Sequence, residues 1–156
     1  MASKLELVRR RGSVRERLIV ALDLDDLELA TELVRSLARE VGMFKIGKQL
    51  FTHAGPQAVR LIQDLGGEIF LDLKFHDIPN TVAKAAIEAT RLGVKMFNVH
   101  ASGSLEMMRL TVKEVERVSR QQKLRRPIMP KEATATPAKL SFVTARWTSS
   151  TAAGTF

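Results

Sequence analysis

Apolar residues along the chain form short continuous runs that alternate with helical stripes. Leu18–Leu22 is an unbroken apolar run, which is typical of a strand buried on both faces. From residue 27 to residue 41 the apolar positions recur three or four apart, which predicts an amphipathic helix. Asp25–Asp26 can cap the start of this helix, and Gly42 is expected to end it. The segment therefore predicts a strand followed by a helix.

The same unit recurs three more times. The further strands are predicted at Met43–Ile46, Glu68–Leu73 and Val94–Val99. The further helices are predicted from Pro56 to Leu65, from Thr81 to Leu92 after a turn at Pro79–Asn80, and from Leu105 to about Gln122. Strict alternation of strands and helices predicts a parallel sheet with right-handed crossovers.

The short, even length of the units favours a (β/α) barrel over a doubly wound sheet. An eight-unit barrel usually needs ~250 residues, and this chain has 156. We therefore expect an α/β fold of the TIM-barrel type with only about the first four β/α units present. The expected organisation is a polar lead-in over residues 1–16, a partial barrel over residues 17–126, and a different segment over residues 127–156.

The segment 127–156 loses the apolar period and is rich in Ala, Thr, Ser and Pro, with Glu132 as its one acidic residue. One interpretation is a disordered tail. The other, which we favour, is a truncation or a change of reading frame that replaced the second half of the barrel. Half a barrel would leave two exposed sheet edges, which native proteins avoid.

Composition narrows the class of protein. The chain has no cysteine, which excludes disulfides, thiolate zinc sites and a cysteine nucleophile. No apolar run approaches the ~20 residues that a membrane helix needs, and the N-terminus has no secretory pattern. These features predict a soluble, cytoplasmic protein that does not bind a membrane.

The net charge of +8 is compatible with a polyanion partner, but much of the excess lies at the two ends of the predicted barrel segment. With no tyrosine and one tryptophan, the chain is poorly supplied for stacking on bases. We therefore expect no nucleic acid partner. A small phosphorylated substrate fits the charge equally well.

The strongest chemical feature is the stretch from Asp72 to Asp77, which reads DLKFHD. In an extended strand, side chains two positions apart share a face, so Asp72 and Lys74 are expected to point the same way. Asp77 would follow on the loop, at the barrel end where active sites lie. A surface salt bridge is the alternative. It is disfavoured because burying two acids and a lysine among apolar strands is costly without a function.

At this point the sequence resembles the orotidine 5'-phosphate decarboxylase family. The stretch FLDLKFHDIPNTV at residues 70–82 is similar to the family signature over its whole length. Other motifs follow in family order: ALD at residues 21–23, FKIG at 44–47, LF with GP at 50–56, and NVHASG at 98–103. Ser104 replaces a glycine that many members carry. The resemblance covers about residues 17–120.

By position, the resemblance implies a role for each charged residue of the first three strand ends. Asp23 and Lys45 match positions that contact the ribose region of the substrate. Asp72 matches the catalytic carboxylate and Lys74 the general acid. Asp77 is the further catalytic residue of this set.

The resemblance also implies a homodimer with shared active sites. Asp77 and Ile78 match positions that reach the neighbouring subunit's site, and Thr81 matches one near that subunit's ribose. The implied reaction converts orotidine 5'-monophosphate to UMP and CO2 in pyrimidine biosynthesis, with no cofactor and no metal. His76 and His100 are expected to be structural, as is the packing of Met107–Met108.

Two rival interpretations remain open. One is a magnesium-dependent sugar-phosphate decarboxylase or aldolase of the same superfamily. It is disfavoured because Lys45 stands where those relatives carry a carboxylate, and a lysine cannot ligate a hard cation. The other is a non-catalytic, truncated fragment. Residues 127–156 show no arginine in a recognisable phosphate-binding context, so we expect this chain alone to have little or no activity.

Overall fold

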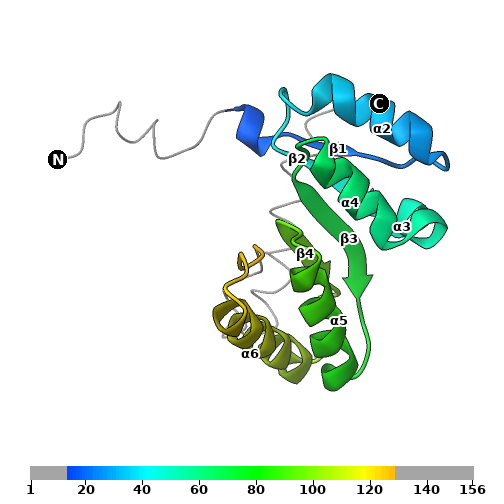
Figure 1. Cartoon of the computed structure of the whole chain (residues 1–156). Helices are drawn as coiled ribbons and strands as arrows, with labels where there is room; N and C mark the ends of the chain where they lie inside the picture. The colour runs from blue at the N-terminus through cyan, green and yellow to red at the C-terminus, as the bar shows by residue number, and fades with distance from the viewer. Residues whose placement is uncertain (1–13, 129–156) are drawn as a thin grey trace. The chain divides into compact units, whose positions relative to one another are not determined.

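The computed structural model of the chain describes residues 14–128 (Figure 1). The described residues fall into two compact units. The first holds the chain up to Leu73 together with Val94–Met96, and the second holds Lys74–Gly93 together with the chain from Phe97 onward. None of the described helices is long and apolar enough to cross a membrane.

The strands form a four-stranded sheet in the order β1-β2-β3-β4. These strands are β1 (Ile19–Ala21), β2 (Met43–Gly47), β3 (Ile69–Phe75) and β4 (Met96–Val99). Both β1 with β2 and β2 with β3 pair in parallel. Strands that are neighbours in sequence are therefore neighbours in the sheet, as the alternating pattern predicted for a barrel-type fold.

The first unit carries a short 3-10 turn, η1 (Arg15–Arg17), and three helices. The helices are α2 (Leu27–Leu37), α3 (Lys48–Ala54) and α4 (Pro56–Asp64). Asp26 caps α2, because its Oδ1 atom accepts the Glu28 N–H at 2.7 Å. The fully buried side chains of this unit include Val34, Phe44, Ile46, Leu50, Val59, Ile62 and Leu71.

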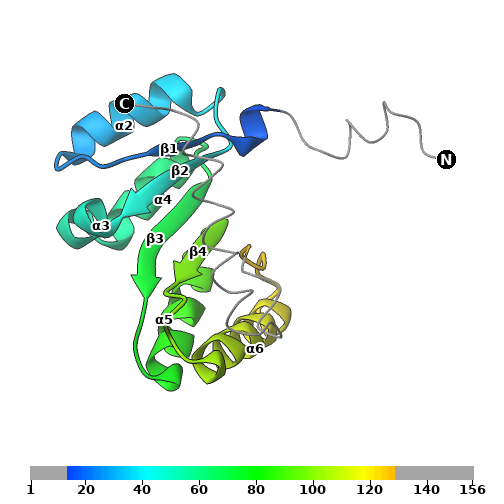
Figure 2. The same ribbon diagram turned by 180° about the vertical axis from the view of Figure 1, so that it is seen from behind.

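The second unit carries α5 (Pro79–Arg91) and α6 (Leu105–Gln121), which lie side by side in both views (Figures 1 and 2). Val82 of α5 and Met107 and Met108 of α6 form its buried cluster, with Phe75 and Val99 packed against it. The methionine pair was predicted to pack in the core or at its rim, and the structure places both side chains in the core. Ser104 caps α6 by accepting the Met107 N–H at 3.0 Å.

Two predicted details of α2 are wrong. The helix ends at Leu37 rather than at Val41, and a hydrogen-bonded turn follows it. Gly42 is not its left-handed cap, because the glycines with positive φ among the described residues are Gly55, Gly66 and Gly93. A Cβ atom at Gly42 would instead overlap the backbone of Glu16. Gly42 is therefore required for close backbone approach.

Other boundaries also differ from the prediction. Pro79 and Asn80 form the first turn of α5 rather than a separate turn, since proline is well suited to the first helical position. Helix α3 was not predicted, and β3 continues to Phe75. Gly93, with φ 73°, follows the end of α5 in the left-handed conformation of a helix-ending glycine, the role that was predicted for it. The predicted tail from residue 129 on, and the lead-in up to residue 13, lie outside the described residues.

Candidate active site

Lys45 lies between two carboxylates in the first unit. Its Nζ atom is 2.9 Å from Asp23 Oδ1 and 3.7 Å from Asp72 Oδ2. The Asp72 side chain is 12% exposed and that of Lys45 is 22% exposed, whereas Asp23 is 63% exposed. An ammonium ion that is largely buried beside a nearly buried carboxylate forms a stronger interaction than a surface pair. The structure thus brings together three of the predicted site residues.

The strand register explains why these side chains meet. Lys45 pairs with Ala21 and Phe70, and Gly47 pairs with Asp72, so Lys45 lies two positions before the level of Asp72 and on the same face of the sheet. Gly47 also leaves space beside the charges, since a Cβ atom there would lie 3.3 Å from Asp23 Oδ1. The ammonium group of Lys45 supplies a positive charge beside Asp72, where a magnesium site would need a further carboxylate.

Lys74 has a backbone conformation that the sequence did not predict. Its φ angle is 52°, in the left-handed region that residues other than glycine rarely adopt. The expectation that Asp72 and Lys74 share a face assumed an extended strand through residue 74, and this assumption is wrong. The Lys74 N–H donates to Asn98 Oδ1 at 2.8 Å. The Lys74 side chain is exposed.

The remaining predicted residues lie where α5 begins. Asp77 Oδ1 accepts the N–H of Ile78 at 2.6 Å. Ile78 is the N-cap residue of α5, and its carbonyl accepts the N–H groups of Thr81 and Val82. Ile78 is 67% exposed, although it is a large apolar residue. Lys74, Asp77, Ile78 and Thr81 therefore belong to the second unit, while Asp23, Lys45 and Asp72 belong to the first.

Two histidines stack in the second unit. The rings of His76 and His100 have centroids 4.8 Å apart and an interplanar angle of 17°. The His100 Nδ1 atom accepts the Ser102 backbone N–H at 3.2 Å and lies 2.6 Å from the Ser102 hydroxyl. These contacts order the loop before α6, which fits the structural role predicted for both histidines.

Asn98 is the residue that sequence reasoning missed. It was quoted within the motif NVHASG but given no role. The signal was present, because Asn98 is a polar residue in a strand that is otherwise apolar, Met96–Val99. Such a residue needs a hydrogen-bond partner when it is partly buried.

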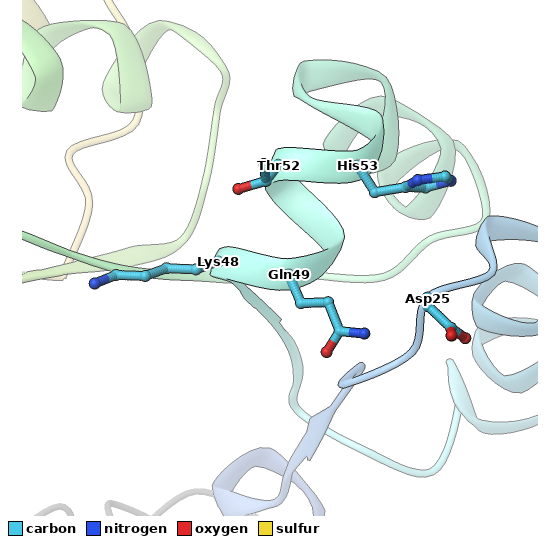
Figure 3. Close-up of a pocket in the computed structure, with 5 residues that line it drawn as sticks. All are labelled: Asp25, Lys48, Gln49, Thr52 and His53. Atoms are coloured by element: carbon cyan, nitrogen blue, oxygen red, sulfur yellow. The ribbon is translucent and has the colours of Figure 1, made fainter.

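A separate hollow of ≈ 510 Å³ lies beside the first turns of α3. It is lined by Asp25, Lys48, Gln49, Thr52 and His53 (Figure 3). In this view Gln49 and His53 extend toward the loop that carries Asp25, and Lys48 extends the other way. The lining includes none of the predicted site residues. Among the described residues, no group of three or more His, Asp or Glu side chains could hold a metal ion.

Several curated proteins with similar sequences are orotidine 5'-phosphate decarboxylases. A sequence model of the orotidine 5'-phosphate decarboxylase / HUMPS family matches residues 16–152. An orotidine 5'-phosphate decarboxylase from Syntrophotalea carbinolica is 67% identical over 94 residues, which is 60% of this chain and 38% of that protein. The one from Geobacter metallireducens is 56% identical over 107 residues, or 69% of this chain and 45% of that protein. The chain thus spans less than half the length of these curated relatives.

Solved structures agree with the sequence match. The crystal structure of orotidine 5'-phosphate decarboxylase from Lactobacillus acidophilus is 38% identical, with a TM-score of 0.58 over 64% of this chain and 45% of that one. The enzyme from Methanocaldococcus jannaschii, complexed with the inhibitor BMP, is 27% identical with a TM-score of 0.58, over 69% of this chain and 49% of that one. Because the family match spans well over half of the sequence, the chain belongs to the orotidine 5'-phosphate decarboxylase / HUMPS family.

Proposed function

We propose that this chain supplies the proton donor and carboxylates of a site that converts orotidine 5'-monophosphate to UMP and CO2. The observation that carries the proposal is the ammonium group of Lys45 held between Asp23 and Asp72, near the carboxyl ends of three parallel strands. In barrel-type folds this end of the sheet carries the chemistry. The reaction belongs to pyrimidine biosynthesis, and we place the protein in the cytoplasm.

The proposed mechanism needs one proton and no cofactor. The bond between C6 of the pyrimidine and its carboxyl group breaks, CO2 leaves, and the electron pair stays on C6. The ammonium group of Lys74 stabilises this charge and then donates a proton to C6, which gives UMP. The lysine regains its proton from solvent. Asp72 lies beside the departing carboxylate, and Asp23 and Lys45 contact the ribose region.

We also propose that the protein acts as a homodimer. Asp77 and Ile78 would reach the site of the partner subunit, and Thr81 would lie near the ribose bound there. The exposure of Ile78 supports this, because a large apolar side chain at the start of a helix gains from burial in an interface. Sedimentation of the wild-type chain and of an Ile78→Asp variant tests it, and equal monomeric behaviour of both would contradict it.

A hybrid enzyme tests the catalytic role independently of chain length. Residues 16–128 of this chain replace the matching part of the Syntrophotalea carbinolica relative, and formation of UMP is measured. We expect turnover by the hybrid, and losses of at least about 100-fold in kcat for Lys74→Ala and for Asp72→Asn. Thr52→Ala, in the separate hollow, serves as the control with unchanged turnover. A Lys74→Ala hybrid that keeps full activity would refute the proposal.

The 156-residue chain is assayed in parallel. The sequence predicts little or no turnover by this chain alone, since residues 127–156 show no recognisable phosphate-binding arginine. Binding energy from the phosphate group is expected to support the chemistry at C6 from a distance. Turnover by the chain close to that of the hybrid would contradict this prediction while leaving the proposed reaction intact.

A further inference from the structure

Lys74 has a backbone conformation that is unfavourable for any residue with a side chain. Lys74 and Lys123 are the described residues other than glycine with positive φ, both at 52°. For an L-residue this region costs roughly 1–2 kcal/mol, because the Cβ atom approaches the neighbouring carbonyl oxygen. Lys123 follows α6 in a Schellman-type end, with the Leu124 N–H bonded to Ser119 O at 2.9 Å. Lys74 follows no helix, so another contact must hold it.

The hydrogen bonds on either side of Lys74 indicate an extra residue in β3. The Lys95 N–H donates to Ile69 O, and the His100 N–H donates to Phe75 O, each at 2.9 Å. Between these two bonds β3 advances six residues, from Ile69 to Phe75, whereas β4 with its flanking residues advances five, from Lys95 to His100. One additional residue on one strand of a pair is the signature of a β-bulge, a device that redirects a side chain near active sites.

The bulge is held by a side chain. The Lys74 N–H donates to the Oδ1 atom of Asn98 on β4 at 2.8 Å. Within β4, Asn98 is partly buried between apolar neighbours. Because the side-chain amide of Asn98 accepts this backbone N–H, the position of the Lys74 Cα atom, and with it the origin of the side chain, depends on Asn98.

We propose that Asn98 is the positioning residue for Lys74: its side-chain carbonyl fixes the left-handed backbone that directs the lysine ammonium toward the reacting carbon. This inference rests on the proposed role of Lys74 as proton donor. Asn98 acts through the lysine and needs no contact with the substrate. Its loss would therefore affect the chemical step more than substrate binding.

The first test is structural and uses the full 156-residue chain with isotopically labelled lysine. Hydrogen exchange of the Lys74 amide is compared in the wild type, Asn98→Ala, Asn98→Asp and Asn80→Ala. Loss of one hydrogen bond should speed exchange about five- to tenfold in Asn98→Ala. Asn98→Asp keeps an acceptor and should restore protection, and Asn80→Ala is the matched control on the exposed start of α5. Exchange unchanged by Asn98→Ala would overturn the proposal.

If Asn98→Ala does not fold, Asn98→Ser replaces it, since its hydroxyl oxygen is too close to its own backbone to replace Oδ1. Folding is judged from the dispersion of the other lysine signals. A folded Asn98→Ser chain with full protection at Lys74 would also overturn the proposal, and loss of protection confined to Lys74 would support it.

The second test measures turnover by the same variants in the hybrid enzyme. We expect Asn98→Ala to lower kcat about 10- to 100-fold with KM within about threefold of the parent, and Asn98→Asp to recover part of the loss. If Asn98→Ala keeps the wild-type kcat while Lys74→Ala is inactive, this inference is refuted and the proposed function is unaffected. Full activity in Lys74→Ala would instead refute the proposed function, whatever the exchange experiment shows.

Discussion

The ammonium group of Lys45 lies 3.7 Å from the carboxylate of Asp72, on the neighbouring strand, and both side chains are mostly withdrawn from solvent. The same ammonium group is 2.9 Å from Asp23, which is far more exposed. One lysine therefore has a nearly buried partner and a solvated one. Burial reduces screening, so the two contacts should differ in their energetic contribution even though the shorter one is to Asp23.

Replacing Lys45 should cost more stability than replacing Asp23. Lys45→Met removes a cation beside the nearly buried Asp72, and we expect a loss of about 1–3 kcal/mol in the free energy of unfolding. Asp23→Asn should cost at most about 1 kcal/mol, because Asp23 is well solvated. Urea unfolding followed by circular dichroism measures both. Lys48→Met, at an exposed position, is the matched control, and equal effects of all three changes would contradict the prediction.

The two acids before α2 should differ in their effect on stability. Asp26 accepts the Glu28 and Leu29 N–H groups at 2.7 and 3.4 Å, so Asp26→Ala should cost ~1 kcal/mol. The capping residue is Asp26, whereas Asp25 lines the hollow beside α3, so Asp25→Ala should change the unfolding free energy by less than ~0.5 kcal/mol. Thermal unfolding of both variants provides the comparison. A larger effect at Asp25 would show that the cap is assigned to the wrong residue.

Gly42 and Gly66 should respond to alanine for different reasons. Gly42→Ala places a Cβ atom on the Glu16 backbone, and overlap with backbone should cost about 1–3 kcal/mol. A Cβ atom at Gly66 meets nothing within 4 Å, so Gly66→Ala should cost only the ~1 kcal/mol of its positive φ. The unfolding midpoints of the two variants decide the order. Stabilisation by Gly42→Ala would mean that the backbone of Glu16 can move aside.

The elements that depend on local pattern could be predicted from the sequence. Helix α6 and strand β2 match their apolar runs closely, since burial leaves a clear pattern of apolar positions. Strand β1 lies within its predicted run, but the prediction that it is buried on both faces is wrong, because Ile19 and Val20 are only partly buried and Leu18 is 49% exposed. The end of α2 could not be predicted. Its apolar spacing continues to Val41, but Gly42 is placed by contact with the distant residue Glu16, which no local pattern records.

The candidate site was only partly predictable for the same reason. The sequence placed Asp23, Lys45 and Asp72 at strand ends of a parallel sheet, but it did not predict that Lys45 lies between the two carboxylates. The backbone of Lys74 did not follow, because strand periodicity assumes extended residues. The hydrogen bond from Lys74 to Asn98 joins residues 24 positions apart. Residues whose conformation departs from local sequence preferences are often found at functional sites, where function outweighs those preferences.

Glycine at position 74 should stabilise the chain relative to alanine there. Both substitutions remove the lysine side chain, but glycine adopts φ 52° without the steric cost of a Cβ atom. The free energy of unfolding of Lys74→Gly should therefore be about 1 kcal/mol higher than that of Lys74→Ala. Lys123→Gly and Lys123→Ala repeat the comparison at a helix end with the same φ and no proposed catalytic role. Urea unfolding of the four variants gives both differences. A glycine advantage at Lys123 alone would show that the Lys74 backbone relaxes once its side chain is removed, whereas an advantage at both positions would mean that the protein retains a lysine at position 74 at a cost in stability.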